Sequence, residues 1–292
     1  MQLINKTADF LNSLLWGPLM IGFIFLTGVY FTVRCGFFQF KNFGFILKNT
    51  LGSLFKKSEK GEGVSPFMAL STALSGSVGI GNIVGVTTAI SLGGPGAVFW
   101  MWFSALFGMM TKYSEIVLAM KFREKNSLGQ YEGGPVYYLK KGLNFKSLAF
   151  FYAIMGLFVS LGMGNLVQSN AMATAVNKSF NIPRIIPGII AAVLIFIIMS
   201  GGVKRIMSLT VVIIPFLSIF YMLFSIIIIL HYINRLPEVL LEILINAFDF
   251  KAIAGGGFGS AVRYGFSRGI FSNEAGLGTS SVSHCTSYVK DP

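Results

Sequence analysis

Long apolar segments separated by short polar connections run through the chain from residue 14 onward. A helix needs about 20 mostly apolar residues to cross a bilayer, because the hydrocarbon layer is about 30 Å thick and a helix rises about 1.5 Å per residue. About seven segments reach or approach this length, and each predicts a transmembrane helix. They are residues 14–33, 66–92, 97–119, 147–176, 185–203, 206–231 and 252–289.

A shorter amphipathic segment, residues 236–250, precedes the last of these helices. Its apolar residues recur at helical spacing, and the acidic residues Glu238, Glu242 and Asp249 fall on another face. Such a helix either lies in the outer membrane interface or forms a solvated connector packed on the helix bundle. The sequence leaves both interpretations open.

The composition agrees with a membrane protein and argues against a soluble one. Hydrophobic residues make up 54% of the chain and charged residues 12%, about half the charged share of ordinary soluble domains. The net charge of +12 raises the question of a nucleic-acid partner. However, the basic residues lie in short segments between apolar runs rather than on one soluble face, so nucleic acid is not expected as a partner.

The connections between the predicted helices are alternately rich and poor in Lys and Arg, and this alternation predicts the topology. The richest connections are residues 34–60 and 121–146. Cytoplasmic loops carry the excess of Lys and Arg in membrane proteins. We therefore expect a multi-pass protein of the inner or plasma membrane, with these two connections in the cytoplasm. The N-terminus and residues 236–250 are then outside.

Two predicted helices contain glycine-rich interruptions, residues 75–82 and 271–280, and both include a Gly-apolar-Gly-polar run. Glycine weakens a helix by roughly 1 kcal/mol relative to alanine, so several together free backbone groups. The N-terminus of a half-helix suits a carboxylate, and unwound carbonyl groups suit Na⁺. The interruptions lie five predicted helices apart, the interval of an inverted repeat. The alternative is close helix packing by small residues.

Several longer motifs point to one family. They are Gly79-Ile-Gly-Asn-Ile-Val-Gly-Val86, Gly93-Gly-Pro-Gly-Ala-Val-Phe-Trp-Met-Trp102, Thr111-Lys-Tyr-Ser-Glu115, Gly133-Gly-Pro-Val-Tyr-Tyr138, Gly164-Asn-Leu-Val-Gln168 and Phe271-Ser-Asn-Glu-Ala-Gly-Leu-Gly278. With these motifs the chain resembles the alanine or glycine:cation symporter family. The resemblance implies an all-α membrane protein with the inverted-repeat fold of five plus five core helices.

The same resemblance implies a division of the chain into three parts. Residues 1–65 hold an extra N-terminal helix and a cytoplasmic loop. Residues 66–235 form the first repeat, with core helices one to five. Residues 236–292 hold the outer connector and core helix six. The chain ends at Pro292, just after that helix. It is therefore expected to be a fragment or a truncated gene product.

The resemblance also implies a substrate site at the interruptions. Small neutral amino acids would contact Asn82, Gln168 and Asn273, with room left by Gly162 and cover from Phe271. Gln168 lies in an apolar helix, where a buried amide needs a partner, either a neighbouring helix or a ligand. Glu274 and Arg268 flank the second interruption, where each either pairs structurally or serves the pathway, Glu274 as a gate.

Sodium positions follow from a more distant likeness. The run Val78-Gly-Ile-Gly-Asn82 is similar to the first core helix of neurotransmitter:sodium symporters. By that likeness the carbonyl groups of Ser75 and Val78 face one sodium ion. The Ser77 carbonyl group and the Asn82 side chain face another, which Ser272 joins.

The implied function is secondary active transport of alanine or glycine coupled to Na⁺, without enzymatic chemistry or an organic cofactor. The two cysteines and two histidines are isolated, so no transition-metal site is expected. A channel would need a ring of like charges or a repeated filter, and neither is seen. An inactive or assembly-dependent fragment of a transporter is the main alternative. The sequence does not choose alanine over glycine, or Na⁺ over H⁺.

Overall fold

The computed structural model describes residues 6, 7, 10, 11, 13, 14, 16–53, 64–127, 129–248 and 259–289. Nearly all regular structure in these residues is helical, which confirms the prediction of an all-helical chain. Three predicted features lie partly outside the described residues. They are the lysines Lys56, Lys57 and Lys60 of the first basic connection, the end of the amphipathic segment from residue 249, and residues 252–258 of the last helix.

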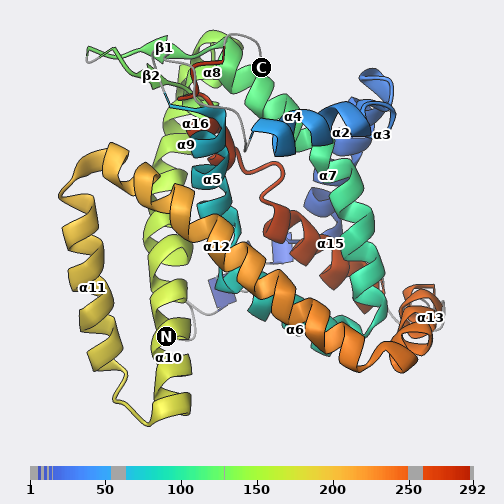
Figure 1. The fold of residues 1–292 in the computed structure, drawn as a ribbon. Helices are drawn as coiled ribbons and strands as arrows, with labels where there is room; N and C mark the ends of the chain where they lie inside the picture. The colour runs from blue at the N-terminus through green and yellow to red at the C-terminus, as the bar shows by residue number, and fades with distance from the viewer. Residues whose placement is uncertain are drawn as a thin grey trace. The chain divides into compact units, whose positions relative to one another are not determined.

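The elements follow one another along the chain as Figure 1 shows. They are α2 (Pro18–Arg34), α3 (Phe38–Lys41), α4 (Phe43–Ser53), α5 (Pro66–Ser77), α6 (Ile80–Gly93), α7 (Gly96–Lys121), β1 (Glu124–Lys125), β2 (Tyr131–Glu132), α8 (Pro135–Lys141), α9 (Lys146–Val159), the π-helix η1 (Ser160–Leu166), α10 (Val167–Phe180), α11 (Ile185–Met199), α12 (Gly202–His231), the 3₁₀ turn η2 (Ile233–Arg235), α13 (Leu236–Ala247), α15 (Ser260–Asn273) and α16 (Thr279–His284).

Two of the predicted transmembrane helices are each divided into half-helices. Residues 66–92 form α5 and α6, and the described part of residues 252–289 forms α15 and α16. The start of α5 has a clear local cause. The Ser65 hydroxyl accepts a hydrogen bond from the Met68 N–H at 3.2 Å, and Pro66 occupies the first turn, where a missing N–H costs nothing.

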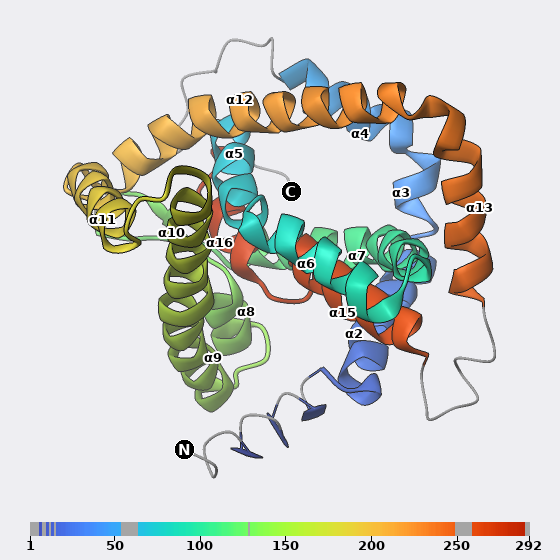
Figure 2. The same cartoon turned by 90° about the horizontal axis from the view of Figure 1, so that it is seen from below.

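The chain divides into two compact units. The first comprises Met1–Gly52, Asn82–Ser114 and Leu223–Leu277. Its apolar core joins α2 to α15, with Ile21 packed among Val262, Phe266 and Ile270. Helices α2 and α7 approach closely, because a Cβ atom on Gly28 would lie 2.8 Å from the Phe107 carbonyl oxygen. Figure 2 shows α15 running beside α6 within this unit.

The predicted amphipathic helix belongs to the first unit, as α13. Its residues Ile243 and Ala247 are buried, and the Trp100 indole N–H donates a hydrogen bond to the Ala247 carbonyl oxygen at 3.0 Å. Part of the apolar face of α13 is therefore packed on the protein, whereas Leu240 and Leu244 of that face are exposed. Its position relative to the membrane stays a prediction.

The second unit comprises Ser53–Gly81, Glu115–Met222 and Gly278–Pro292. Here α16 packs against α5, and α8 packs against α9. Helix α11 returns alongside α10, as Figure 1 shows. The two short strands β1 and β2 form an antiparallel hairpin in which Glu124 pairs with Glu132.

Within the described residues, two helices are long and apolar enough to cross a membrane by themselves. One is Lys146–Phe180, which combines α9, η1 and α10, and the other is Gly202–His231. Helices α5 and α6 are together also long and apolar enough to cross a membrane when they are counted as one bent span. Helices α2 and α11 are apolar but shorter. The count of seven spans and the inverted repeat stay predictions.

Candidate binding site at the helix breaks

The first break separates α5 from α6 at Val78 and Gly79. Val78 has an extended backbone, with φ −87° and ψ 91°, so the helix cannot continue through it. The last carbonyl groups of a helix and its first N–H groups lack partners within the helix. The break therefore leaves carbonyl groups at the end of α5, where Ser75, Ser77 and Val78 lie, close along the chain to N–H groups at the start of α6.

The side chain of Gln168 bonds to the start of α6. Its Oε1 atom accepts a hydrogen bond from the Ile80 N–H at 3.2 Å. Gly79 makes this approach possible, because a Cβ atom there would lie 3.1 Å from Gln168 Nε2. The amide of Gln168 thus occupies one of the free donors at the N-terminus of the half-helix.

A π-helix ends two residues before Gln168, and the sequence pattern does not predict it. Residues Ser160–Leu166 form this segment, η1, which includes Gly162 and Gly164. The Asn165 side-chain amide donates to the Ser160 carbonyl oxygen at 3.0 Å, one of the acceptors that the wider turn presents. Short π-segments are frequent at functional sites. The paired glycines beside two amide residues were the available signal for it.

The second break lies between α15 and α16 and depends on residues in the left-handed region. Glu274 has φ 50°, Gly276 has φ 91° and Gly278 has φ 75°. Glycine adopts such values without the steric cost that a Cβ atom adds. Glu274 bears that cost, and it is the residue that ends α15.

The last turn of α15 meets the first turn of α6 within the first unit. The Ser272 hydroxyl donates a hydrogen bond to Asn82 Oδ1 at 2.6 Å. Two oxygen atoms from half-helices far apart in sequence are thereby brought together. Side-chain oxygen atoms of this kind are suitable ligands for a hard cation.

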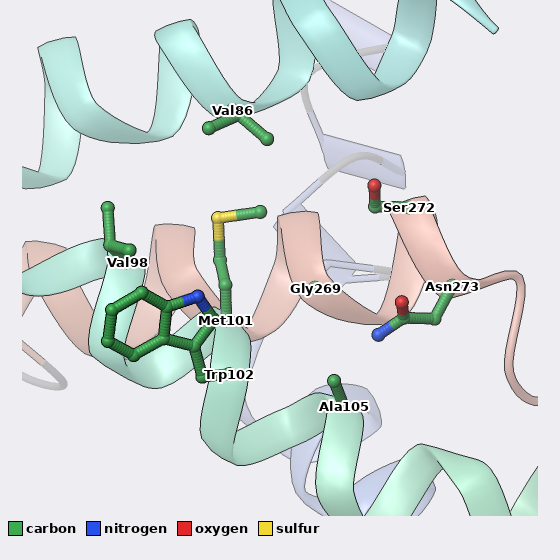
Figure 3. A pocket seen from close by; sticks show the side chains of 8 residues that line it. All are labelled: Val86, Val98, Met101, Trp102, Ala105, Gly269, Ser272 and Asn273. Atoms are coloured by element: carbon green, nitrogen blue, oxygen red, sulfur yellow. The ribbon is translucent and has the colours of Figure 1, made fainter. Parts of the chain in front are cut away.

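A small cavity of about 180 Å³ lies beside the end of α15, as Figure 3 shows. The Asn273 amide points into it, while most of the other lining side chains are apolar. The lining residues are Val86, Val98, Met101, Trp102, Ala105, Gly269, Ser272 and Asn273. Phe271 contacts Trp16 instead, in an edge-to-face arrangement with ring centroids 6.0 Å apart.

Lys112 of α7 holds the end of α15 and was not foreseen as a partner of it. Its Nζ atom donates to the Asn273 carbonyl oxygen at 3.1 Å and lies 3.9 Å from Glu274 Oε2. A cation at the C-terminus of a helix is favoured by the helix dipole. Glu274 therefore has a structural partner in the folded chain.

The residues that the sequence predicted as ligands fall into two groups. Ser75, Ser77, Val78, Gly162 and Gln168 belong to the second unit. Asn82, Phe271, Ser272 and Asn273 belong to the first. The structure joins Asn82 to Ser272, and Gln168 to the chain at Gly79 and Ile80. That these residues form one binding site stays a proposal.

A largely helical chain with apolar spans and interrupted helices has the features of a secondary transporter of the membrane. The chain belongs to the sodium:alanine symporter family, whose sequence profile matches residues 1–292. The family resemblance seen in the motifs is thus confirmed, and the chain is an integral membrane protein. The family is one of cation-coupled amino-acid transporters rather than enzymes, with sodium as the coupling ion.

Several transporters are similar to almost the whole chain. An uncharacterized transporter of Haemophilus influenzae is 43% identical, over 99% of this chain and 64% of its own length. The sodium/alanine symporter AgcS of Methanococcus maripaludis is 40% identical, over 96% and 63%. The probable sodium/glutamine symporter GlnT of Bacillus subtilis is 37% identical, over 100% and 60%. The chain thus spans slightly less than two thirds of the length of these relatives.

Proposed function

We propose that the chain provides the binding site of a transporter that moves a small neutral amino acid together with Na⁺ by alternating access. The observation that carries this proposal is the first break, where α5 ends at Ser77 and α6 begins at Ile80. The break presents carbonyl oxygens and N–H groups within a few residues of chain. A zwitterion and a cation need this combination, because one requires donors and acceptors and the other requires oxygen ligands.

The proposed sodium ligands are the carbonyl groups of Ser75, Ser77 and Val78 with the side chains of Asn82 and Ser272. The negative end of the α5 dipole favours a cation near the first three. The short hydrogen bond from Ser272 to Asn82 Oδ1 supports the second position, because it keeps two oxygen atoms within 2.6 Å of each other. Both oxygen atoms would coordinate a bound ion once the Ser272 hydroxyl hydrogen rotates away from Asn82 Oδ1.

The proposed substrate ligands are Gln168, Asn82 and Asn273, with the N–H groups of α6 for the carboxylate. Gln168 accepts a hydrogen bond from the Ile80 N–H, so its amide is positioned at this helix end. A carboxylate at the same place would accept from the neighbouring donors and from the Gln168 amide. Phe271 is proposed to cover the small side chain of the substrate.

The proposed substrate is alanine or glycine. Gly162 is a half-buried residue without a side chain, and it lies in the π-helix just before Gln168. This arrangement leaves room for a small substrate. Relatives named for alanine transport support the choice, while a relative named for glutamine makes side-chain size the property to test.

Equilibrium binding tests the proposal. Radiolabelled L-alanine and glycine would be bound to the purified protein in sodium chloride and in choline chloride. Binding is expected in sodium only. The changes Asn82→Ala and Gln168→Ala each remove a polar contact, so affinity should fall about 5- to 150-fold, equivalent to about 1–3 kcal/mol. Gly162→Leu should abolish binding by bulk.

Two further variants sharpen the test. Gln130→Ala removes the same side chain from an exposed position of the hairpin and should leave affinity within about twofold. Gln168→Glu keeps an acceptor for the Ile80 N–H but places a negative charge beside the substrate carboxylate. It should preserve thermal stability and weaken binding. If Asn82→Ala and Gln168→Ala both bind like the parent at every sodium concentration, the site lies elsewhere and the glycines serve helix packing.

A further inference from the structure

Two segments far apart in sequence meet at the ends of α5 and α16 that lie away from the breaks. Val64, just before α5, and Ser287, just after α16, form a parallel β-bridge. The Val64 N–H donates to the Thr286 carbonyl oxygen at 3.1 Å, and the Tyr288 N–H donates to the Val64 carbonyl oxygen at 3.1 Å. The start of one half-helix is thus joined to the end of the other through the backbone.

The two half-helices also pack along each other, as Figures 1 and 2 both show. The buried side chains on them are small. They are Ala69, Ser71 and Ala73 on α5 and Ser280 and Ser281 on α16. Small side chains let helices approach closely without large rearrangement. We therefore treat α5 and α16 as one body.

Arg123 fixes this body to the β-hairpin. Its Nη1 atom donates to the carbonyl oxygens of Cys285 at 3.1 Å and Ser287 at 2.6 Å, and its Nη2 atom donates to that of Val289 at 2.7 Å. The guanidinium carbon lies 4.1 Å from the centroid of the Tyr131 ring, which belongs to β2. One side chain thereby holds three carbonyl groups of the segment that follows α16. The planar guanidinium group donates from two separate nitrogen atoms and stacks on a ring at the same time, whereas a lysine ammonium group has all its donors on one nitrogen atom.

The Cys285 side chain lies under this arrangement and is 0% exposed. The neighbouring hairpin backbone covers it, because a Cβ atom on Gly133 would lie 3.1 Å from Cys285 Sγ. Reaction of this thiol with a reagent from solution therefore requires the segment after α16 to separate from the hairpin. Cys285 is a built-in reporter of that separation.

We propose that Arg123 is a positioning residue that latches the body formed by α5 and α16 to the β-hairpin, at the end opposite the helix breaks. The latch sets where the carbonyl groups at the end of α5 and the glycines before α16 lie, and its release lets α5 and α16 move together away from the hairpin. On the predicted topology this end faces the cytoplasm, so the latch closes the inner end of the pathway. This last role rests on the proposed transport function, whereas the latch itself does not.

Labelling of Cys285 tests the latch. The protein in detergent would be treated with N-ethylmaleimide, and mass spectrometry of its peptides would follow Cys285 and Cys35 separately. Arg123→Gln removes the charge-assisted hydrogen bonds, so the labelling rate of Cys285 should rise about tenfold or more. Cys35 is exposed in the parent, and its rate should stay within about twofold. An unchanged Cys285 rate in Arg123→Gln overturns the proposal.

Three variants complete the experiment. Arg184→Gln alters an exposed arginine of the same unit and should leave the Cys285 rate unchanged. Arg123→Lys keeps the charge and should still label several-fold faster than the parent, because its donors share one nitrogen atom and it has no planar group to stack on Tyr131. Tyr131→Leu keeps apolar bulk but removes the stacked ring, and should raise the rate about 2- to 5-fold. It tests the latch even if Arg123→Gln does not fold.

A second labelling experiment, with ligands present, tests whether the latch is coupled to transport. Sodium chloride with L-alanine should change the Cys285 rate of the parent relative to choline chloride, and the change should vanish in Arg123→Gln. A merely structural arginine would not remove a ligand response. Faster labelling of Arg123→Gln without any ligand effect in the parent supports the latch and contradicts the sodium-coupled function. A full ligand response that persists in Arg123→Gln contradicts the positioning role.

Discussion

The close approach of Gln168 to Gly79 gives a quantitative prediction for Gly79→Ala. The added methyl carbon would lie 3.1 Å from Nε2 and 3.5 Å from Oε1 of Gln168. Optimal non-bonded contacts between heavy atoms are about 3.5–4.0 Å, so the amide must move by a few tenths of an ångström. The hydrogen bond between the Ile80 N–H and Gln168 Oε1 is already 3.2 Å long, and this movement should break it.

The expected loss is the net value of one hydrogen bond, about 0.5–1.5 kcal/mol. This corresponds to about 2- to 13-fold in the dissociation constant for L-alanine. Replacing glycine by alanine also restricts the unfolded chain, an effect of about 0.4–1 kcal/mol on stability. A double-mutant cycle separates the two effects, because the second is present in both backgrounds and cancels.

The assay is the dissociation constant for L-alanine in sodium chloride, measured for the parent, Gly79→Ala, Gln168→Ala and the double variant. Gly79→Ala should weaken binding about 2- to 13-fold in the parent and less than about twofold in the Gln168→Ala background. Gly156→Ala is a matched control, since a Cβ atom there would meet nothing within 4 Å. Equal effects of Gly79→Ala in both backgrounds would refute the reasoning.

Three other predictions concern single contacts. Ser272→Ala removes the donor to Asn82 and one proposed ligand, and should raise the half-saturating sodium concentration about 2- to 13-fold in an equilibrium titration. Lys112→Met removes the bond to the Asn273 carbonyl group and the pairing with Glu274, and should lower stability by about 1.5 kcal/mol in thermal unfolding, more than Glu274→Gln does. Gly28→Ala places a Cβ atom 2.8 Å from the Phe107 carbonyl oxygen and should destabilise by about 1–3 kcal/mol, whereas Gly22→Ala on the same helix meets nothing within 4 Å and should be neutral or stabilising.

For each of these three predictions, one result would contradict it. A sodium titration of Ser272→Ala that overlays the parent would remove Ser272 from the proposed ligands. Equal melting temperatures for Lys112→Met and Glu274→Gln would show that the bond to the Asn273 carbonyl group adds nothing to the ion pair. Equal stabilities of Gly28→Ala and Gly22→Ala would contradict the close approach of α2 and α7.

The sequence alone determined the helical class, the family and the places where helices are interrupted. Apolar runs of the required length leave few alternatives in a membrane, because every backbone polar group must be satisfied inside the segment. The glycine clusters at 75–82 and 271–280 weaken helices wherever they occur, so the breaks at Val78–Gly79 and at Glu274–Gly278 were predictable to within a few residues. The family motifs needed no structure, since they are runs of consecutive residues.

Other features depended on which distant segments meet. Nothing local indicates that Arg123 bonds the carbonyl groups after α16, since the basic residues of its connection are equivalent by pattern. The pairing of Lys112 with the end of α15 likewise joins residues that are 161 positions apart. The π-helix before Gln168 changes which face the amide presents, and a pattern with period 3.6 does not reveal it.

The features that the sequence predicts and those that it does not differ in the range of the interactions that produce them. Hydrophobicity, glycine content and charge act on the nearest residues or on the choice between water and lipid, so they can be read along the chain. The hydrogen bonds of Gln168, Ser272 and Arg123 depend on side chains whose partners are fixed only when helices pack. Packing brings a donor and an acceptor within about 3 Å through the sum of many apolar contacts, and no single residue in the sequence carries that information.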